Sequence, residues 1–260
     1  MEPDFTIRKV AIIGARGQMG GLFAARCRDA GIEVAAVDRP LTDEKIAAGF
    51  AGADIVYVSV PAAAMAQVME RIQPFLAPPH ILVDNVSVKV APLKDMARCY
   101  DGPIVGTHPL FGPVPPDEAR VAVTPGRADD PGRDEAAMRV VEDWTLRLGF
   151  TPFRTTAEQH DKAAAQIQGL NFVTTVAYLA ALGQQEDILP FLTPSFERRL
   201  VAAKKMVMED AELFAGMFEA NPFGQDAVRR FRNFLHVAAG GDVDILIDRA
   251  RWWFREERDA

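Results

Sequence analysis

One stretch near the start of this 260-residue chain decides the fold, and it reads Val10-Ala11-Ile12-Ile13-Gly14-Ala15-Arg16-Gly17-Gln18-Met19-Gly20. The apolar residues predict a strand, the glycines a tight turn, and the segment from 17 to 30 a helix. Glycine lets a backbone approach a pyrophosphate, and a helix N-terminus offers free N–H groups to phosphate oxygens. The spacing G-x-x-G-x-x-G is one residue longer than the common fingerprint, so the loop alone is a weak signal.

Asp38 strengthens the interpretation of this loop as a dinucleotide site. It closes a second predicted strand (33–38), where a carboxylate receives the ribose 2′-hydroxyl of NAD and repels the 2′-phosphate of NADP. Arg39 leaves an alternative, because a guanidinium can bind that phosphate. We expect NAD rather than NADP; a purely structural glycine-rich turn is the remaining reading. The residues expected to bind the cofactor are Gly14, Arg16, Gly17, Gln18, Met19, Gly20, Asp38, Arg39, Val60 and Pro61.

The rest of the chain divides into two parts by its hydrophobic pattern. Further short apolar runs at 54–60, 81–84, 104–106 and 121–124 alternate with helical patterns, which predicts parallel β-α-β units. Beyond residue 150 the pattern predicts only helices, at 157–182, 196–218, 226–239 and 243–257. We therefore expect an α/β Rossmann domain with a doubly wound parallel sheet over residues 1–153, followed by an all-α domain over 154–260.

Composition excludes several functional classes. The formal net charge of -7 argues against a nucleic-acid binder, which would carry a basic stripe. Cys27 and Cys99 are the only cysteines, so neither a disulfide framework nor a cysteine-rich zinc site is indicated. No metal-ligand spacing is present, and no apolar run is long enough for a membrane span or a signal peptide. We expect a cytoplasmic protein without a metal, a membrane or a nucleic-acid partner.

Several side chains that could carry chemistry follow predicted strands, where ligands of open α/β sheets bind. His108 follows the strand at 104–106 and could act as a general base, although a structural loop histidine fits equally well. Ser87 could bind a substrate hydroxyl or cap the next helix, and Lys89 could offset negative charge on a substrate. His160 begins the helical part beside Asp161, where simple helix-terminus chemistry is the favoured reading of the residues alone.

Together these segments resemble the prephenate dehydrogenase family, particularly the bacterial form fused to chorismate mutase. The resemblance covers nearly the whole chain. Its most specific part is His108-Pro109-Leu110-Phe111-Gly112-Pro113 followed by the pair His160-Asp161. The other matching segments are Gly17–Gly20, Val58–Pro61, Asp84–Lys89, Ile167-Gln168 and Trp253-Phe254.

The resemblance implies a Rossmann domain joined to a helical domain that forms most of a homodimer interface, with the active site between the two domains. His108 would take the proton of the substituent on ring carbon C4 as hydride leaves for NAD. Ser87 would hold that substituent and help order the nicotinamide, and His160 would orient the substrate from the helical side. Gln168 falls within a family motif and becomes a substrate-binding candidate. The substrate would be a small cyclohexadienyl dicarboxylic acid.

One position departs from the family pattern. The family places an arginine for a substrate carboxylate in the helix after its Ser-Pro motif, and counting from Thr193-Pro194 that position is Lys205. Lysine keeps the charge but loses the bidentate fork. Either Lys205 serves, or Arg198 or Arg199 substitutes, or the substrate differs. Without an appended mutase or regulatory module in this sequence, we expect no feedback control of that kind.

Four functions follow from the resemblance. The first is NAD-dependent conversion of prephenate to 4-hydroxyphenylpyruvate in tyrosine biosynthesis. The alternative is a 4-amino-4-deoxyprephenate dehydrogenase that makes 4-aminophenylpyruvate for antibiotic biosynthesis, and Lys205 leaves room for it. Arogenate specificity is a third. A catalytically silent NAD-binding protein is the hypothesis from another class, and the joint presence of His108, Ser87 and His160 argues against it.

Overall fold

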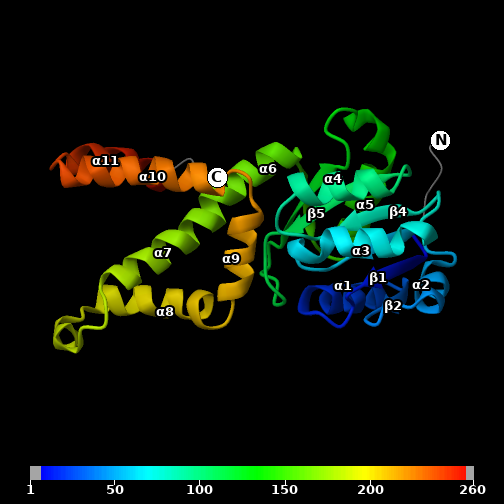
Figure 1. The fold of residues 1–260 in the computed structure, drawn as a ribbon, viewed down its shortest axis with the longest axis horizontal. Coiled ribbons are helices and arrows are strands. Elements are labelled where there is room, and N and C mark those ends of the chain that lie inside the picture. Colours follow the sequence, from blue (N-terminus) through cyan, green and yellow to red (C-terminus); the bar gives the residue numbers. More distant parts are fainter. Residues whose placement is uncertain (1–6, 256–260) are drawn as a thin grey trace.

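The structure, a computed structural model, describes residues 7–255. A seven-stranded sheet with flanking helices occupies the first part of the chain, and the second part is helical (Figure 1). The strands are β1 (Lys9–Ile13), β2 (Glu33–Val37), β3 (Ile55–Val58), β4 (Ile81–Asp84), β5 (Ile104–Pro109), β6 (Arg120–Pro125) and β7 (Thr151–Arg154). The helices around the sheet are α1 (Gln18–Asp29), α2 (Asp43–Phe50), α3 (Met65–Ile72), α4 (Val90–Cys99) and α5 (Glu135–Arg147).

The sheet order is β2-β1-β3-β4-β5-β6-β7, and the strands from β2 to β5 are all parallel. The strand order reverses at β1, which lies between β2 and β3, so a ligand crevice is expected at the carboxyl ends of these strands. The expectation of a doubly wound Rossmann sheet is confirmed. The sheet is not wholly parallel, however, because β6 pairs antiparallel with β5.

Two apolar cores cover the two faces of the sheet, as side chains on each strand alternate between them. One core joins Val10 and Ile12 to Phe23 of α1 and Trp144 of α5. The other joins the intervening strand residues to α2, α3 and α4. Because the parallel strands are buried on both faces, they are nearly continuous apolar runs in the sequence.

The helical part contains α6 (Ala157–Ala164), α7 (Leu170–Ala181), α8 (Pro194–Met208), α9 (Ala211–Ala220), α10 (Gly224–Ala239) and α11 (Val243–Arg251). A π turn (Ala165–Gly169) joins α6 to α7, and the 3₁₀ turns are Ala62–Ala64, Gln73–Phe75, Pro131–Asp134, Glu186–Phe191 and Trp252–Phe254. In Figure 1, α6 leads from the sheet into this part, and α9 lies between α8 and the sheet. No helix within residues 7–255 is long and apolar enough to cross a membrane.

Several elements differ from the sequence-based expectations. The helix expected over 196–218 is two helices, α8 and α9, because the chain turns at Glu209 and Asp210. Strand β7 was not expected, and it adds an edge strand just before the helical part. The helix expected over 243–257 ends at Arg251, and its predicted last residues lie outside the described part.

Candidate active site

The glycine loop between β1 and α1 is shaped so closely that two glycines cannot be replaced without displacing backbone. Gly14 has a φ of +82°, and a Cβ there would lie 2.2 Å from the carbonyl oxygen of Ser59. A Cβ on Gly20 would lie 2.1 Å from the carbonyl oxygen of Gly14. Gly17 caps α1 without a side-chain hydrogen bond, so the first N–H groups of this helix remain available to an anion. This loop fits a pyrophosphate.

Asp38 follows β2 at the edge of the same crevice. Its carboxylate accepts a hydrogen bond from the backbone N–H of Arg16 at 3.1 Å. It also lines a cavity of about 360 Å³ together with Arg16, Arg39 and Lys45. A carboxylate so placed suits a ribose diol, while the surrounding cations suit phosphate oxygens. The other expected cofactor residues lie nearby: Gln18 and Met19 in the first turn of α1, and Val60 and Pro61 just after β3.

Hydrogen bonds connect this crevice to the carboxyl end of β4. The side-chain amide of Asn85 donates to the hydroxyl of Ser59 at 3.0 Å, and its backbone N–H donates to the carbonyl of Val58 at 3.3 Å. The carbonyl of Ser59 is the group that faces Gly14. The ends of β1, β3 and β4 therefore form one continuous edge, and β5 lies directly beside β4.

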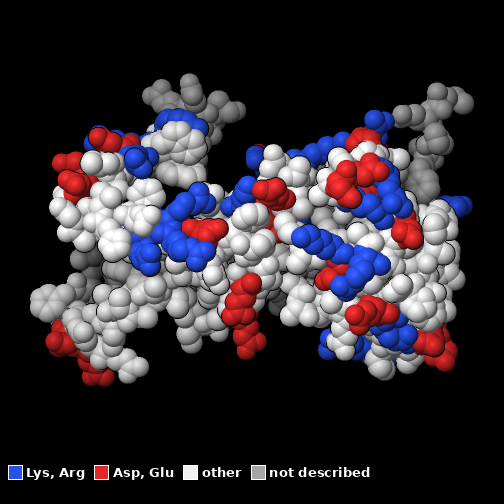
Figure 2. All heavy atoms as spheres, turned by 45° about the horizontal axis from the view of Figure 1, so that its top comes forward, with Lys and Arg blue, Asp and Glu red and all other residues white. Residues whose placement is uncertain are grey.

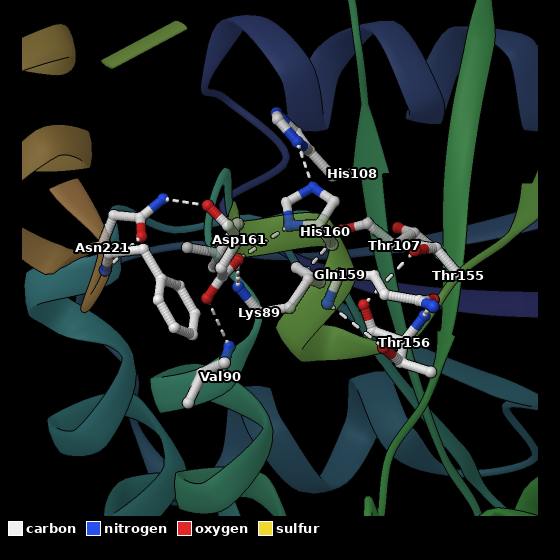
Figure 3. Close-up of polar contacts among 12 residues, drawn as sticks. Lys89, Val90, Thr107, His108, Thr155, Thr156, Gln159, His160, Asp161 and Asn221 are labelled. Carbon is white, nitrogen blue, oxygen red and sulfur yellow. Dashed lines mark hydrogen bonds and ion pairs between the residues drawn. The ribbon is translucent and has the colours of Figure 1, made fainter. Parts of the chain in front are cut away.

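His108 and His160 meet at this edge, although 52 residues separate them. The Nδ1 atom of His108 lies 2.8 Å from Nε2 of His160 (Figure 3). His108 lies in β5, which is longer than expected, and His160 lies in α6. Both side chains are buried. Burial, with help from the positive charge of Lys89 and from His160, lowers the pKa of His108 well below its ordinary value of 6.5. His108 is therefore a neutral imidazole at neutral pH.

Asp161 connects the histidine pair to helix α4. Its carboxylate accepts hydrogen bonds from the backbone N–H groups of Lys89 at 2.7 Å and Val90 at 2.8 Å, and it lies 2.8 Å from Nδ1 of His160 (Figure 3). The side-chain amide of Asn221 donates to the Asp161 carbonyl at 2.8 Å. This fully buried carboxylate thus joins the two parts of the chain, which also meet where Met217 of α9 packs into the core beside α3 and α4.

Comparison with known proteins shows which family the chain is similar to. Residues 23–147 match the family model described as the nucleotide-binding domain of prephenate dehydrogenase. The T-protein of Haemophilus influenzae is 31% identical over 214 residues, which are 80% of this chain and 55% of that protein. The chain is thus similar to the prephenate dehydrogenase family, over the nucleotide-binding domain and along most of its length. It spans just over half the length of this T-protein.

Solved structures of the prephenate dehydrogenase family share the fold. The prephenate dehydrogenase of A. aeolicus, in complex with hydroxyphenyl propionate and NAD+, has a TM-score of 0.76 at 17% identity, covering 98% of this chain and 99% of that one. The arogenate dehydrogenase of Synechocystis has a TM-score of 0.74 at 19% identity, covering 96% and 99%. Both likenesses confirm a Rossmann domain followed by a helical region, and the family model confirms that the first domain binds a nucleotide.

Lys89 lies in a different place from the one expected. It was predicted to offset charge on a substrate, but its side chain is fully buried. The ammonium is paired with the Asp84 carboxylate and donates to the Thr107 carbonyl at 2.6 Å. Burial lowers the pKa of Lys89, and the Asp84 charge opposes that shift. An ammonium already held by two buried oxygens does not face a substrate, so its role here is to support the ends of β4 and β5.

Ser87 is half-buried in the turn between β4 and α4. Ser87 does not cap the next helix, which was the alternative role for it. Helix α4 begins after Lys89, and the backbone N–H groups of Lys89 and Val90 bind Asp161 instead. Ser87 therefore remains a substrate-binding candidate at the carboxyl end of β4.

The three cations on α8 lie apart from the histidine pair. Lys205 is 64% exposed and lies 3.8 Å from Asp210, and the Arg199 guanidinium stacks over the ring of Tyr178 at 4.0 Å. Arg198 is exposed. Within this single chain α8 lies across α9 from the sheet (Figure 1), so the structure brings none of the three into the cluster around His108.

Gln168 lies in the π turn that follows α6, and its Oε1 atom is buried without a partner among the described residues. An unpaired buried acceptor is costly, and π turns are frequent at functional sites. This observation keeps Gln168 as a candidate for binding a ligand donor.

Sequence reasoning missed three residues of the cluster. Asp161 was read as ordinary helix-terminus chemistry, while Asp84 and Asn221 were assigned no role. The contact of Asp161 with Lys89 spans 72 residues, so no local spacing could reveal it. The one available signal was the family resemblance of the His160-Asp161 pair, because Ser87 stood in the sequence as an apparent cap for α4.

Proposed function

We propose that this chain is an NAD-dependent dehydrogenase that oxidatively decarboxylates prephenate to 4-hydroxyphenylpyruvate. The observation that carries the proposal is the buried His108–His160 pair at the carboxyl end of β5, on the same sheet edge as the glycine loop. Similarity to the prephenate dehydrogenase family supports the reaction type, and the match over residues 23–147 supports a nucleotide cofactor.

The reaction needs a base, alignment and a dry site, because aromatisation of the ring supplies the driving force. His108 is neutral and buried, so its imidazole can take the proton of the hydroxyl on C4. The C4–H bond breaks with loss of hydride, and the bond from the ring to its carboxylate breaks with release of carbon dioxide. NAD held at the glycine loop would supply the acceptor for that hydride, and the proton on His108 would return to the phenolate oxygen of the product. Ser87 and His160 would orient the ring, as the family resemblance implies.

Asp38 supports the choice of NAD over NADP. Its carboxylate stands at the end of β2, where the 2′-hydroxyl of the adenosine ribose would lie and a 2′-phosphate would be repelled. The cations beside it, Arg16 and Arg39, reduce that repulsion. We therefore propose a preference for NAD rather than an absolute requirement.

The second candidate is oxidation of 4-amino-4-deoxyprephenate to 4-aminophenylpyruvate. Lys205 leaves room for it, because a lysine in place of the expected carboxylate-binding arginine departs from the family pattern and allows a substrate other than prephenate. The two substrates differ only at C4, so most of the site would serve both. Arogenate, which differs in the side chain, is the third candidate.

The apolar surface of the helical part supports a homodimer formed through residues 154–260, which we treat as a second domain. Helix α7 is rich in apolar residues, yet none of its residues is buried. Phe191 and Val201 are 81% and 76% exposed. Exposed apolar surface on this scale is typical of subunit interfaces, and a second copy would present the same surface.

Formation of NADH with prephenate, 4-amino-4-deoxyprephenate and arogenate, measured side by side, tests the function. We expect the highest kcat/KM with prephenate. A higher value with the amino compound would favour the second candidate. Tight NAD binding without turnover of any of the three would contradict an enzyme and revive a silent NAD-binding protein.

A further inference from the structure

The Asp161 carboxylate has a fixed set of partners. Its Oδ1 faces the backbone N–H of Lys89 and Nδ1 of His160, and its Oδ2 accepts from the backbone N–H of Val90. Two of these three partners are backbone donors at the N-terminus of α4, where positive dipole and free N–H groups stabilise a carboxylate anion. An ionised carboxylate is an acceptor only. The third partner, Nδ1 of His160, must therefore carry a proton.

That proton determines the state of both rings. When Nδ1 of a neutral histidine carries the proton, its Nε2 has a free lone pair. Nε2 of His160 lies 2.8 Å from Nδ1 of His108, so with a neutral His160 ring Nδ1 of His108 is the donor in that contact. Nε2 of His108 is then left without a proton. In Figure 3 this second nitrogen points away from His160.

We propose that Asp161 is a positioning residue that fixes the tautomers of His160 and His108 in series, so that His108 presents an unprotonated Nε2 to the substrate. The proposal about the tautomers stands on the hydrogen bonds alone. Its consequence for turnover rests on the proposed function.

The surroundings hold Asp161 in place from both parts of the chain. Asn221 donates to its backbone carbonyl at 2.8 Å, and the Asn221 Oδ1 accepts from the backbone N–H of Phe223 at 2.9 Å. Lys89, whose backbone binds the carboxylate, is itself held by Asp84. A change in the docking of α6 against α4 would thus move the carboxylate and the histidines together. A purely structural clamp would have the same contacts, so the test must read the proton positions.

Nitrogen-15 NMR of the histidine side chains distinguishes the two roles in the full chain. In the wild type we expect His160 and His108 each to carry the proton on Nδ1. Asp161→Ala removes the acceptor and should leave both rings in mixed tautomers. Asp161→Asn keeps one acceptor oxygen but loses the charge. Its tautomer populations should lie between those of the wild type and those of Asp161→Ala. Glu158→Ala is the matched control: it removes another carboxylate of α6, one whose exposed ion pair with Lys162 lies outside the histidine cluster, and it should leave the wild-type tautomers.

Turnover gives the second readout. Asp161→Ala should lower kcat by roughly 10²–10⁴-fold, the range for losing an oriented base, with KM and NAD affinity much less changed. A wild-type spectrum with the His108 proton on Nε2 would overturn the proposal, as would unchanged tautomers in Asp161→Ala. Should that variant not fold, the wild-type and Asp161→Asn spectra still decide. Failure of the proposed function would appear separately, as absence of wild-type turnover with the tautomers intact.

Discussion

At the scale of single residues, His108 is the group on which the chemistry depends. Its burial against His160 and beside the Lys89 charge keeps it neutral, whereas an exposed histidine would be protonated below pH 6.5. Three predictions belong to this scale, and each concerns one side chain.

Replacing His108 removes the proposed base and little else. His108→Asn should lower kcat by about 10²–10⁴-fold, because general base catalysis contributes an effect of that size. The dissociation constant for NAD, measured by titration, should stay nearly unchanged. His236→Asn, an exposed position late in α10, is the control. Near-normal turnover of the His108 variant would show that the base lies elsewhere.

The lowered pKa of His108 predicts the pH dependence of activity. The neutral form persists in the folded protein below 6.5, so the acid limb of kcat/KM should lie on the acid side of that value. The unfolded chain binds a proton at this histidine below 6.5 while the folded chain does not, so this residue lowers folding stability as pH falls from 6.5. A pH–rate profile with an acid limb at or above 6.5 would contradict the assignment.

Asp38 determines the adenosine end of the cofactor site. Asp38→Ala should narrow the preference for NAD over NADP, because the carboxylate no longer repels a 2′-phosphate while Arg16 and Arg39 remain. The ratio of kcat/KM for the two cofactors measures this effect, with the exposed Glu44→Ala as control. An unchanged ratio would indicate that Arg39, rather than Asp38, determines the preference between NAD and NADP.

At the scale of elements, the decisive feature is the close approach of α1, β1 and β3 at the glycine loop. Gly14→Ala should destabilise the fold by about 1–3 kcal/mol from the left-handed backbone, with a further loss from the clash at Ser59. It should also weaken NAD binding. Gly52→Ala is a matched control, because Gly52 has a φ of +68° with nothing within 4 Å of its Cβ position. Denaturant melts of both variants would measure the loss of stability, and titrations would measure the loss of NAD affinity. Equal losses in the Gly14 and Gly52 variants would contradict the role of close packing at Gly14.

The helix termini show where element-level reasoning holds and where it fails. Helix α6 begins with a capping box in which Thr156 and Gln159 exchange hydrogen bonds, and the sequence placed its start at Ala157 correctly. The break between α8 and α9 has neither proline nor glycine, so the periodic pattern gave no reason to divide the helix. There the chain turns because of its packing rather than because of a proline or glycine signal.

At the scale of the molecule, charged side chains are spread over the surface, whereas uncharged surface is concentrated on the helical part. On the face drawn in Figure 2, acidic and basic side chains are interspersed, and much of the helical part carries neither. Such a surface fits a second protein subunit better than a polyanion. The interface we propose therefore lies on the helical part.

The dimer yields a prediction with a matched control. Val201→Glu places a charge on α8, where the side chain is 76% exposed, and should shift the dimer toward monomer in sedimentation equilibrium. Val114→Glu, at an 86% exposed position in the loop after β5, should leave the dimer intact. If the Val201→Glu variant stays dimeric, the interface lies on another surface. A monomeric wild type would refute the proposed dimer.

The sequence by itself determined most of the order of elements and the glycine loop, since glycine turns and alternating strands are local patterns, while the family resemblance made both histidines candidates. Only the tertiary structure decided that Lys89 is buried beneath the site and that Asp161 joins α4 to His160. These contacts join residues as much as 72 positions apart. Their geometry follows from how α6 packs against the sheet, and no spacing along the chain encodes that packing directly.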